Sequence, residues 1–291
     1  MTESTAWAAL PQRGILSVSG PQAKDFLQGL VSQDVTLASP AQMIHAALLS
    51  PQGRFRHEMF VIEGASGEYW LETVRDDIPA LIALLQQYRL RAQVTFKDIS
   101  DAWGVAWADG ATACAAHDKI FMDPRLPALG WRAFLPRPMI EDCQDGTDAY
   151  RKHRLGLGVA DAQYDAKRDH DLLSDLNFDL LHGISWTKGC YIGQEVTARM
   201  HHRRLVKKRL FPVHWQGQEI IWGSPVHGSD DKPCGEMRSC FLEQGQWQGL
   251  ALLDMMVVAE HVQMAPSLYG SLGQTLYMAW PSWMPISCVA S

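Results

Sequence analysis

Three short apolar segments, separated by tight-turn sequences, constrain the fold of this chain more than any other feature. They lie near residues 43–49, 54–62 and 69–74. Pro51-Gln52-Gly53 separates the first two, and Gly64-Ala65-Ser66-Gly67 separates the last two. Connections this short predict an antiparallel meander, because a parallel strand pair needs a crossover of about a dozen residues or more. The pattern therefore excludes a sheet made from repeated parallel crossovers.

Helix-type spacing flanks this meander on both sides. After Pro21, the apolar residues at positions 23, 26, 27, 30 and 31 predict one face of a helix. Asp76-Asp77-Ile78-Pro79 places acids and a proline where a second helix begins. Strand-like pieces are predicted near residues 13–18, 93–99, 102–108, 119–123 and 131–135. This order of elements predicts an α+β fold with antiparallel sheets.

The pattern changes near residue 205. Beyond this point no stretch shows helical periodicity, and glycines separate short apolar pieces at 217, 223, 228, 235, 245 and 249. The C-terminal part is therefore predicted to be a small all-β domain, either a barrel or a two-sheet roll.

Composition excludes several functional classes. The net charge of −6 gives the whole molecule no electrostatic reason to bind nucleic acid. The longest apolar runs contain Pro79 or Asp254, which argues against an integral membrane protein. The N-terminus resembles no export signal, so the six cysteines are expected to be reduced thiols and the protein cytoplasmic. The chain also lacks the phosphate-binding loop, dinucleotide-binding and nucleophile-elbow motifs.

The most unusual stretch is Lys188-Gly189-Cys190-Tyr191-Ile192-Gly193-Gln194-Glu195. Its glycines allow a tight turn or a close backbone contact. Good helix formers follow Gly193, so Cys190 is expected just before a helix N-terminus, with Lys188 two residues away. Both features lower the pKa of a thiol and favour the reactive thiolate. An ordinary buried structural cysteine is the alternative, and residue type alone leaves both interpretations open.

A basic segment follows this motif, and we define it as residues 199–209. It contains six Lys or Arg residues, and no acidic residue occurs between Glu195 and Glu219. The segment suits an anionic ligand such as a carboxylate or phosphate, or it is a solvated interdomain linker. His201-His202 is a weak metal site because neighbouring helix residues do not share a face. No metal site is predicted, since no His/Cys cluster has zinc or iron–sulfur spacing.

Two other polar groups carry weaker signals. His57 and Glu58 follow the Pro51-Gln52-Gly53-Arg54 turn, and both are compatible with exposed positions on a plain hairpin. Asp123-Pro124-Arg125 is predicted to be a turn, and it carries little signal for function.

The residues at 188–195 resemble K-G-C-Y-x-G-Q-E, the signature of the YgfZ proteins, which are folate-binding relatives of the glycine-cleavage T-protein (aminomethyltransferase). Shorter pieces are similar to other family motifs in the same order. These pieces are Val18–Pro21 with Phe26–Val31 and Asp34-Val35, Leu49–Phe55, Tyr88–Arg91 and Arg154–Gly156. The resemblance thus covers most of the chain.

This resemblance implies a ring of two α+β subdomains and a C-terminal β-barrel around a folate. The expected divisions are an N-terminal folate-binding subdomain (1–100), a second subdomain with the motif (101–204) and the barrel (205–291). It also implies tetrahydrofolate or a one-carbon derivative as cofactor, and a role in assembling or repairing iron–sulfur clusters. Iron–sulfur assembly proteins or client enzymes would be the partners. Whether such a protein is an enzyme with turnover stays open.

Site residues follow from the motif and the resemblance together. Cys190 is the candidate reactive residue. Gln194 and Glu195 suit the donor–acceptor edge of a pterin, and Arg199 suits its anionic glutamate tail. Tyr191 could stack on the ring. The candidate cofactor-binding residues are Lys188, Tyr191, Gln194, Glu195, Arg199 and Glu58.

The T-protein differs from this chain at one informative place. It has two aspartates where His57 and Glu58 stand here, and it lacks the K-G-C-Y signature. A glutamate keeps the charge but reaches one methylene further, which matters for a reacting group. We therefore favour the YgfZ type. The alternatives are a folate-dependent aminomethyltransferase, a folate protein linked to tRNA modification, a nucleic-acid module that uses the basic segment, and a structural scaffold.

Overall fold

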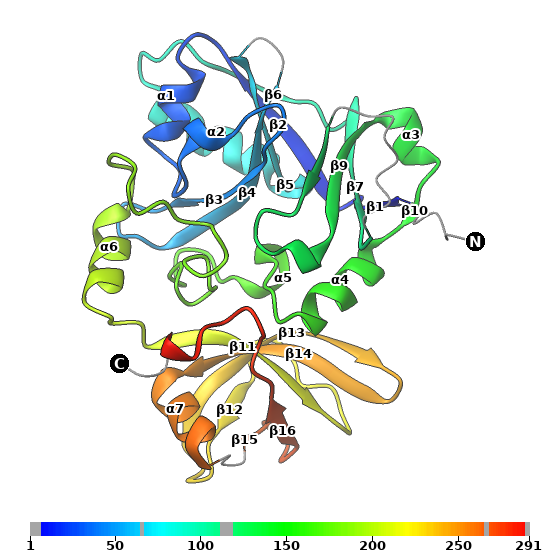
Figure 1. Cartoon of the computed structure of the whole chain (residues 1–291), viewed down its shortest axis with the longest axis vertical. Coiled ribbons are helices and arrows are strands. Elements are labelled where there is room, and N and C mark those ends of the chain that lie inside the picture. The colour runs from blue at the N-terminus through cyan, green and yellow to red at the C-terminus, as the bar shows by residue number, and fades with distance from the viewer. Residues whose placement is uncertain (1–6, 65–66, 111–118, 265–267, 289–291) are drawn as a thin grey trace. The chain divides into compact units, whose positions relative to one another are not determined.

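The computed structural model describes residues 7–64, 67–110, 119–264 and 268–288, and Figure 1 shows its elements. Contacts between residues divide the chain into two units. The first comprises Met1–Tyr150 and Leu181–Gln194, and the second comprises Arg151–Leu180 and Glu195–Ser291. The three-domain division expected from the sequence stays a prediction.

The first sheet of the first unit contains the meander that the sequence predicts. Its strand order is β3-β4-β5-β2-β6, and all neighbouring strands are antiparallel. The strands are β2 (Arg13–Ser19), β3 (Ile44–Leu49), β4 (Phe55–Glu63), β5 (Tyr69–Val74) and β6 (Thr95–Asp98). Side chains alternate between two buried faces, because Met59 and Val61 enter one core while Phe60 and Ile62 enter another.

Two helices cover one face of this sheet (Figure 1). They are α1 (Ala23–Gln28) and α2 (Ile78–Arg89), close to the two predicted helices. Leu27 of α1 and Leu81 and Leu85 of α2 are fully buried against Leu16 and Leu48 of the sheet. This layer of helices on the sheet buries the apolar helix faces that the spacing of the sequence predicts.

The second sheet packs on the other face. Its order is β10-β1-β7-β9-β8, with bounds β1 (Ala8–Ala9), β7 (Trp103–Ala108), β8 (Ile120–Met122), β9 (Trp131–Pro136) and β10 (Gln144–Asp145). Phe60 and Trp70 of the first sheet share a core with Trp107 and Phe134 of the second. The short β1–β10 pair is parallel, while the other pairs are antiparallel. Ile140 of α3 (Arg137–Glu141) packs on the far face.

The second unit contains a closed barrel with strand order β11-β14-β13-β12-β15-β16. The strands are β11 (Lys208–Trp215), β12 (Pro225–His227), β13 (Pro233–Glu243), β14 (Gln246–Asp254), β15 (Leu268–Tyr269) and β16 (Thr275–Met278). The predicted fold class, α+β with a C-terminal barrel, is confirmed. The expectation of an all-β C-terminal part is wrong, because α7 (Met255–Met264) is a helix.

The remaining helices are α4 (Thr147–Gly156), α5 (Ala162–Asp165) and α6 (Gln194–His202). Buried arginine–aspartate pairs hold residues 157–180 on the second unit's core. Arg154 Nη1 lies 2.6 Å from Asp165 Oδ2, and Arg209 Nη2 lies 2.6 Å from Asp179 Oδ2. Arg238 pairs with Asp171 in the same way (3.1 Å). Each pair satisfies a buried charge that would otherwise be costly.

Candidate functional site

The segment before and through the Lys-Gly-Cys-Tyr motif is held on the first unit by hydrogen bonds. The Ser185 N–H donates to the carbonyl of Ser32 (3.0 Å), and the Ser32 hydroxyl donates to the carbonyl of Gly183 (2.6 Å). Further along, the Ile192 N–H donates to the carbonyl of Gly29 (3.3 Å). The motif thus lies over the end of α1 and the residues that follow it.

Lys188 anchors this segment from the inside. Its Nζ donates to the carbonyls of Val31 (2.7 Å) and Gln33 (2.9 Å) and lies 5.2 Å from the centre of the Tyr191 ring. Burial lowers the pKa of Lys188 to about 8, and the charge of Asp34 opposes that shift. Because its ammonium group already serves two backbone oxygens, Lys188 holds the turn in place.

Gly193 joins the motif to the β3–β4 hairpin. A Cβ atom at this position would lie 2.5 Å from the carbonyl oxygen of Ser50 and 3.1 Å from the Cα of Gly53. The φ angle of Gly193 is also +80°, which side-chain-bearing residues rarely adopt. Two sequence motifs about 140 positions apart therefore meet at a contact that only glycine allows.

Cys190 is exposed on this anchored turn, and Tyr191 is buried beneath it. Helix α6 begins at Gln194, as the sequence predicts, four residues beyond the cysteine. The boundary between the two units falls between Gln194 and Glu195. The reactive role expected for Cys190 stays a prediction.

The polar motif residues on α6 are accessible. Gln194 is half-buried, and its Oε1 accepts a long hydrogen bond from the Tyr191 N–H (3.4 Å). Glu195 and Arg199 are exposed, one helical turn apart, and no described residue forms an ion pair with either. Their carboxylate and guanidinium groups are therefore open to solvent.

Glu58 lies apart from the motif, within a buried charge network that sequence reasoning missed. Asp123 is at its centre and is 1% exposed. It accepts hydrogen bonds from the Nη2 of Arg125 (2.8 Å) and the Nε of Arg132 (2.9 Å). Arg132 also contacts Glu72, whose Oε1 lies 2.9 Å from Arg13 Nε.

The network contains three guanidinium groups and three carboxylates. The two charged residues of the predicted turn at 123–125, Asp123 and Arg125, are both buried. Burial opposes the ionisation of Asp123, but the guanidinium groups of Arg125 and Arg132 hold its pKa well below the usual range. A possible signal was the charged pair directly after the apolar strand residues Ile120–Met122.

His45 and Glu58 form the edge of this network. The Nε2 of His45 lies 2.8 Å from Glu58 Oε1, its Nδ1 lies 3.3 Å from the carbonyl oxygen of Leu181, and the ring stacks on Phe60. Burial lowers the pKa of His45. Burial alone would raise the pKa of Glu58, but the hydrogen bond from His45 and the charge of Arg125 lower it to about 2. Glu58 is therefore an ionised, buried group and not an exposed hairpin residue.

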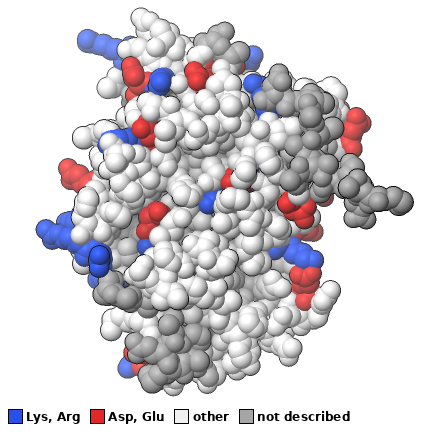
Figure 2. Space-filling view, in the orientation of Figure 1, with Lys and Arg blue, Asp and Glu red and all other residues white. Residues whose placement is uncertain are grey.

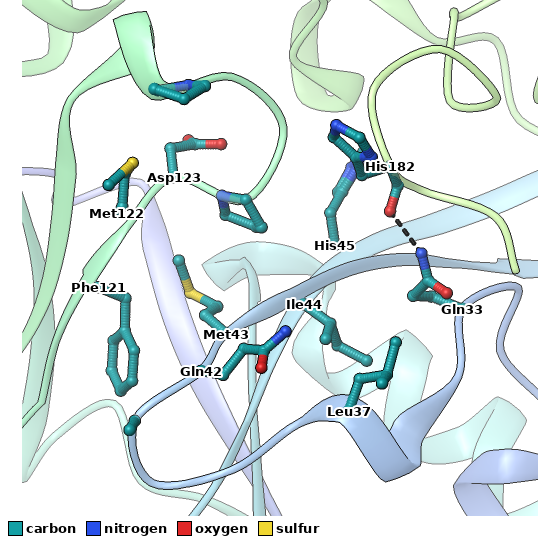
Figure 3. Close-up of a pocket in the computed structure, with 13 residues that line it drawn as sticks. Gln33, Leu37, Gln42, Met43, Ile44, His45, Phe121, Met122, Asp123 and His182 are labelled. Carbon is teal, nitrogen blue, oxygen red and sulfur yellow. Dashed lines mark hydrogen bonds between the residues drawn. The ribbon is translucent and has the colours of Figure 1, made fainter.

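A pocket of about 480 Å³ opens beside the network in the first unit. Figure 3 shows Phe121, Met122 and Asp123 on one side and residues 42–45 on the other, with His182 near His45. The carboxamide of Gln33 donates to the His182 carbonyl (2.7 Å) across part of its wall. Apolar walls with a few fixed polar groups are typical of small-molecule sites.

Three further findings concern the described residues only. None of the helices there is both long enough and apolar enough to span a bilayer. No set of three or more His, Cys, Asp or Glu side chains among them is arranged to hold a metal ion. The five cysteines in the described ranges are free, and Cys114 lies outside those ranges.

Comparison with known proteins finds relatives that share one description. No family model matches the chain. It is 35% identical over 233 residues to the iron–sulfur cluster assembly factor IBA57 homolog, mitochondrial, of Mycosarcoma maydis, a match spanning 72% of this chain and 58% of that protein. It is 32% identical over 291 residues to the human iron–sulfur cluster assembly factor IBA57, mitochondrial, spanning 87% of this chain and 79% of that protein. The chain thus spans less than two thirds of the fungal relative.

A solved structure supports the fold. The glycine cleavage system aminomethyltransferase T from Bartonella henselae matches with a TM-score of 0.74, over 96% of this chain and 86% of that chain. The two sequences are 14% identical, so this likeness concerns the fold alone.

The expected cytoplasmic location is wrong. The fungal, mouse and human relatives are all described as mitochondrial, which points to mitochondria and not to a plain cytoplasm. The expectation rested on the N-terminal sequence alone, whereas the correction rests on the relatives.

Proposed function

Because this chain belongs to the family of the iron–sulfur cluster assembly factor IBA57, we propose that it takes part in assembling iron–sulfur clusters. The observation that carries the proposal is the exposed thiol of Cys190 on a turn fixed by Lys188 and Gly193. An exposed cysteine on a rigid support is suited to contact iron, because thiolates are the usual ligands of iron–sulfur clusters.

One thiolate cannot hold a cluster alone, since clusters generally take four protein ligands. Cys190 would supply one of them to a cluster in transit. The remaining ligands would come from an iron–sulfur assembly protein or from the client enzyme that receives the cluster. In this proposal the cluster is cargo, and the chain positions it at an exposed surface.

We further propose that the chain binds a reduced folate, in line with its YgfZ-like signature. The donor set on α6 fits such a ligand, because Gln194 and Glu195 suit the pterin edge and Arg199 suits the glutamate tail. Neither charged group is engaged in an ion pair with a described residue. Bound tetrahydrofolate would supply a reduced pterin and a carrier for one-carbon units.

The other candidate cofactor residues act less directly in this proposal. Lys188 and Tyr191 would hold the turn that carries Cys190. Glu58 would orient His45 in the wall of the first unit's pocket, since its carboxylate is bonded to that ring. This carboxylate is bonded to His45 and lies 3.7 Å from Arg125 Nη1, and no observation favours aminomethyl transfer by it.

The assembly role is tested by complementation. Cells that lack the chain receive Cys190→Ser or, as a control, Cys143→Ser, which changes a half-buried cysteine of the first unit. We expect Cys190→Ser to leave iron–sulfur enzyme activities low and Cys143→Ser to restore them, at equal protein abundance. Restoration by both variants would contradict the proposal.

Folate binding is tested by calorimetric titration with tetrahydrofolate. Glu195→Ala is expected to weaken binding at least tenfold because it removes the carboxylate from the pterin edge. Glu260→Ala is the control, because it removes another exposed helical glutamate, on α7. Equal affinities for both variants would refute the assignment of Glu195.

A further inference from the structure

The segment between α2 and β6 presents one leucine side chain to solvent. Leu90 directly follows α2 and is 87% exposed, which is the highest value among the large apolar side chains of the described residues. Tyr88 and Ala92, two positions before and after it, pack on the core of the first unit. The fold therefore buries the neighbours of Leu90 and gains no burial from the leucine itself. Neither proposed function uses this stretch, which contains one of the pieces that are similar to family motifs.

The backbone of Leu90 has a conformation that leucine rarely adopts. The Ala92 N–H donates to the Arg89 carbonyl (2.7 Å), which closes a four-residue turn with Leu90 in its second position. The φ and ψ angles of Leu90 are 45° and −107°. They lie close to those of a type II′ turn, in which this position usually belongs to glycine. The leucine is thus strained as well as exposed, and residues kept under strain cluster at functional sites.

The turn is held firmly on the side of β6. The Gln93 N–H donates to the side-chain oxygen of Gln22 (2.7 Å). The backbone at Gln93 also lies so close to Gly20 that a Cβ atom on the glycine would be 2.2 Å from the Gln93 carbonyl oxygen. Val94 follows and is buried in the core of the first unit. These contacts fix the turn before any partner arrives, and such preorganisation lowers the entropic cost of binding.

Two positive charges flank the leucine. Arg89 and Arg91 are exposed, and neither guanidinium group forms a hydrogen bond or an ion pair with a described residue. Lys or Arg side chains project at the upper left of Figure 2, where the segment between α2 and β6 lies in Figure 1. An apolar side chain between two unpaired cations is complementary to an apolar pocket that has carboxylates at its rim.

A bilayer surface matches the turn less well. Segments that bind anionic membranes usually carry about four to eight cations, whereas this turn has two. One leucine also provides little insertion, since even a complete myristoyl chain binds membranes only marginally. Protein interfaces, in contrast, commonly depend on a few anchors in well-packed pockets, and arginine is enriched among them. The turn therefore favours a protein partner.

We propose that the turn formed by residues 89–92 is a docking site for a partner protein. Leu90 enters an apolar pocket of that protein, and the two arginines contact carboxylates at the rim of the pocket. The site explains why a strained, exposed leucine stands where glycine would relieve the backbone. The proposal needs neither the cluster role of Cys190 nor folate binding, so it can fail while both of those stand.

The partner is captured with p-benzoylphenylalanine, a photo-cross-linking residue, placed at position 90 of the full chain in cells that lack the native chain. We expect one main adduct, with a protein that has an acidic surface. The control is the same residue at position 272, because Leu272 is 67% exposed between β15 and β16. The adduct should be absent in the control and should weaken when Arg89→Gln and Arg91→Gln are added. An adduct with a second copy of the chain, or no adduct specific to position 90, would overturn the proposal.

The captured protein is then purified and titrated into the chain by calorimetry. Leu90→Gly should weaken binding at least tenfold because it removes the anchor, while the melting temperature of the chain stays equal or rises. Leu272→Gly is the matched control and should bind as the wild type does. Arg89→Gln with Arg91→Gln should weaken binding and reduce its dependence on salt. Equal affinity of Leu90→Gly and wild type contradicts the proposal. A lower melting temperature of Leu90→Gly also contradicts it, because the leucine would then serve the fold.

A flotation assay tests the lipid alternative. The chain is mixed with vesicles of phosphatidylcholine, alone or with phosphatidylglycerol, and no binding that depends on Leu90 is expected. If the vesicles with phosphatidylglycerol bind the wild type and not Leu90→Gly, the turn is a membrane anchor and the protein partner is refuted.

Discussion

Asp123→Asn is expected to destabilise the first unit strongly, because it removes one carboxylate from a balanced buried network. Asp123 accepts four hydrogen bonds from Arg125 and Arg132, three of them through guanidinium nitrogens. The asparagine would turn its amide nitrogen toward one set of these donors. The buried network would then contain three guanidinium groups and only two carboxylates.

The magnitude follows from the burial of the whole network. Breaking a buried ion pair by removing one partner costs about 3–5 kcal/mol, because the remaining charge is left uncompensated. This free energy corresponds to an increase of about a hundredfold or more in the population of opened first unit. The second unit has a separate core, so its barrel should keep its stability.

Hydrogen exchange followed by mass spectrometry measures both units in one experiment. Amides of β4 and β9 should exchange about a hundredfold faster in Asp123→Asn, and those of β13 and β14 at the wild-type rate. Asp230→Asn is the control, because that aspartate pairs with Lys232 on the surface (2.7 Å) and should change neither unit. If Asp123→Asn behaves like this control, the network does not hold the two sheets together and our reasoning is refuted.

Two further predictions concern the turn and the pH dependence. Gly193→Ala should destabilise the first unit by about 2 kcal/mol or more, because the φ of +80° and the close contact with Ser50 both disfavour a side chain. Gly189→Ala is the control, because the space around its Cβ position is open. Urea unfolding should show almost no change in the stability of Gly189→Ala. The pKa of Glu58 is about 2 in the folded state, below its ordinary value of 4.5. Its contribution, about 3 kcal/mol, is therefore complete above pH 4.5 and is lost as the pH falls from 4.5 to 2. Urea midpoints measured across this range should fall less steeply in Glu58→Gln than in wild type, and parallel curves would contradict the assignment.

Local patterns were sufficient to predict most elements of the fold. The meander β3–β4–β5 follows from short turn sequences, and α1, α2 and α6 follow from apolar spacing or from the residues after Gly193. Helix α7 was missed because its first turns, Met255 to Ala259, are apolar on every side and show no period. A uniformly apolar stretch of that length is equally compatible with a strand.

The buried network could not be predicted for a different reason. Arg132 and Glu72 are 60 positions apart, and each is a single charge within a strand. A charge in an alternating strand usually faces solvent, and only packing of two sheets face to face buries it. The same packing creates the pocket, whose two sides come from β3 and from the end of β8.

The turn from Lys188 to Tyr191 contains side chains that hold it in place and one side chain, that of Cys190, that is exposed. Lys188 was expected to act on a ligand or on the thiol, yet its ammonium group is committed to the carbonyls of Val31 and Gln33. Removing it would leave both oxygens without this donor and would release the turn. Cys190 is the exposed side chain of this turn and can contact a partner. A loss of function in a Lys188 variant would therefore mean that Cys190 has been displaced.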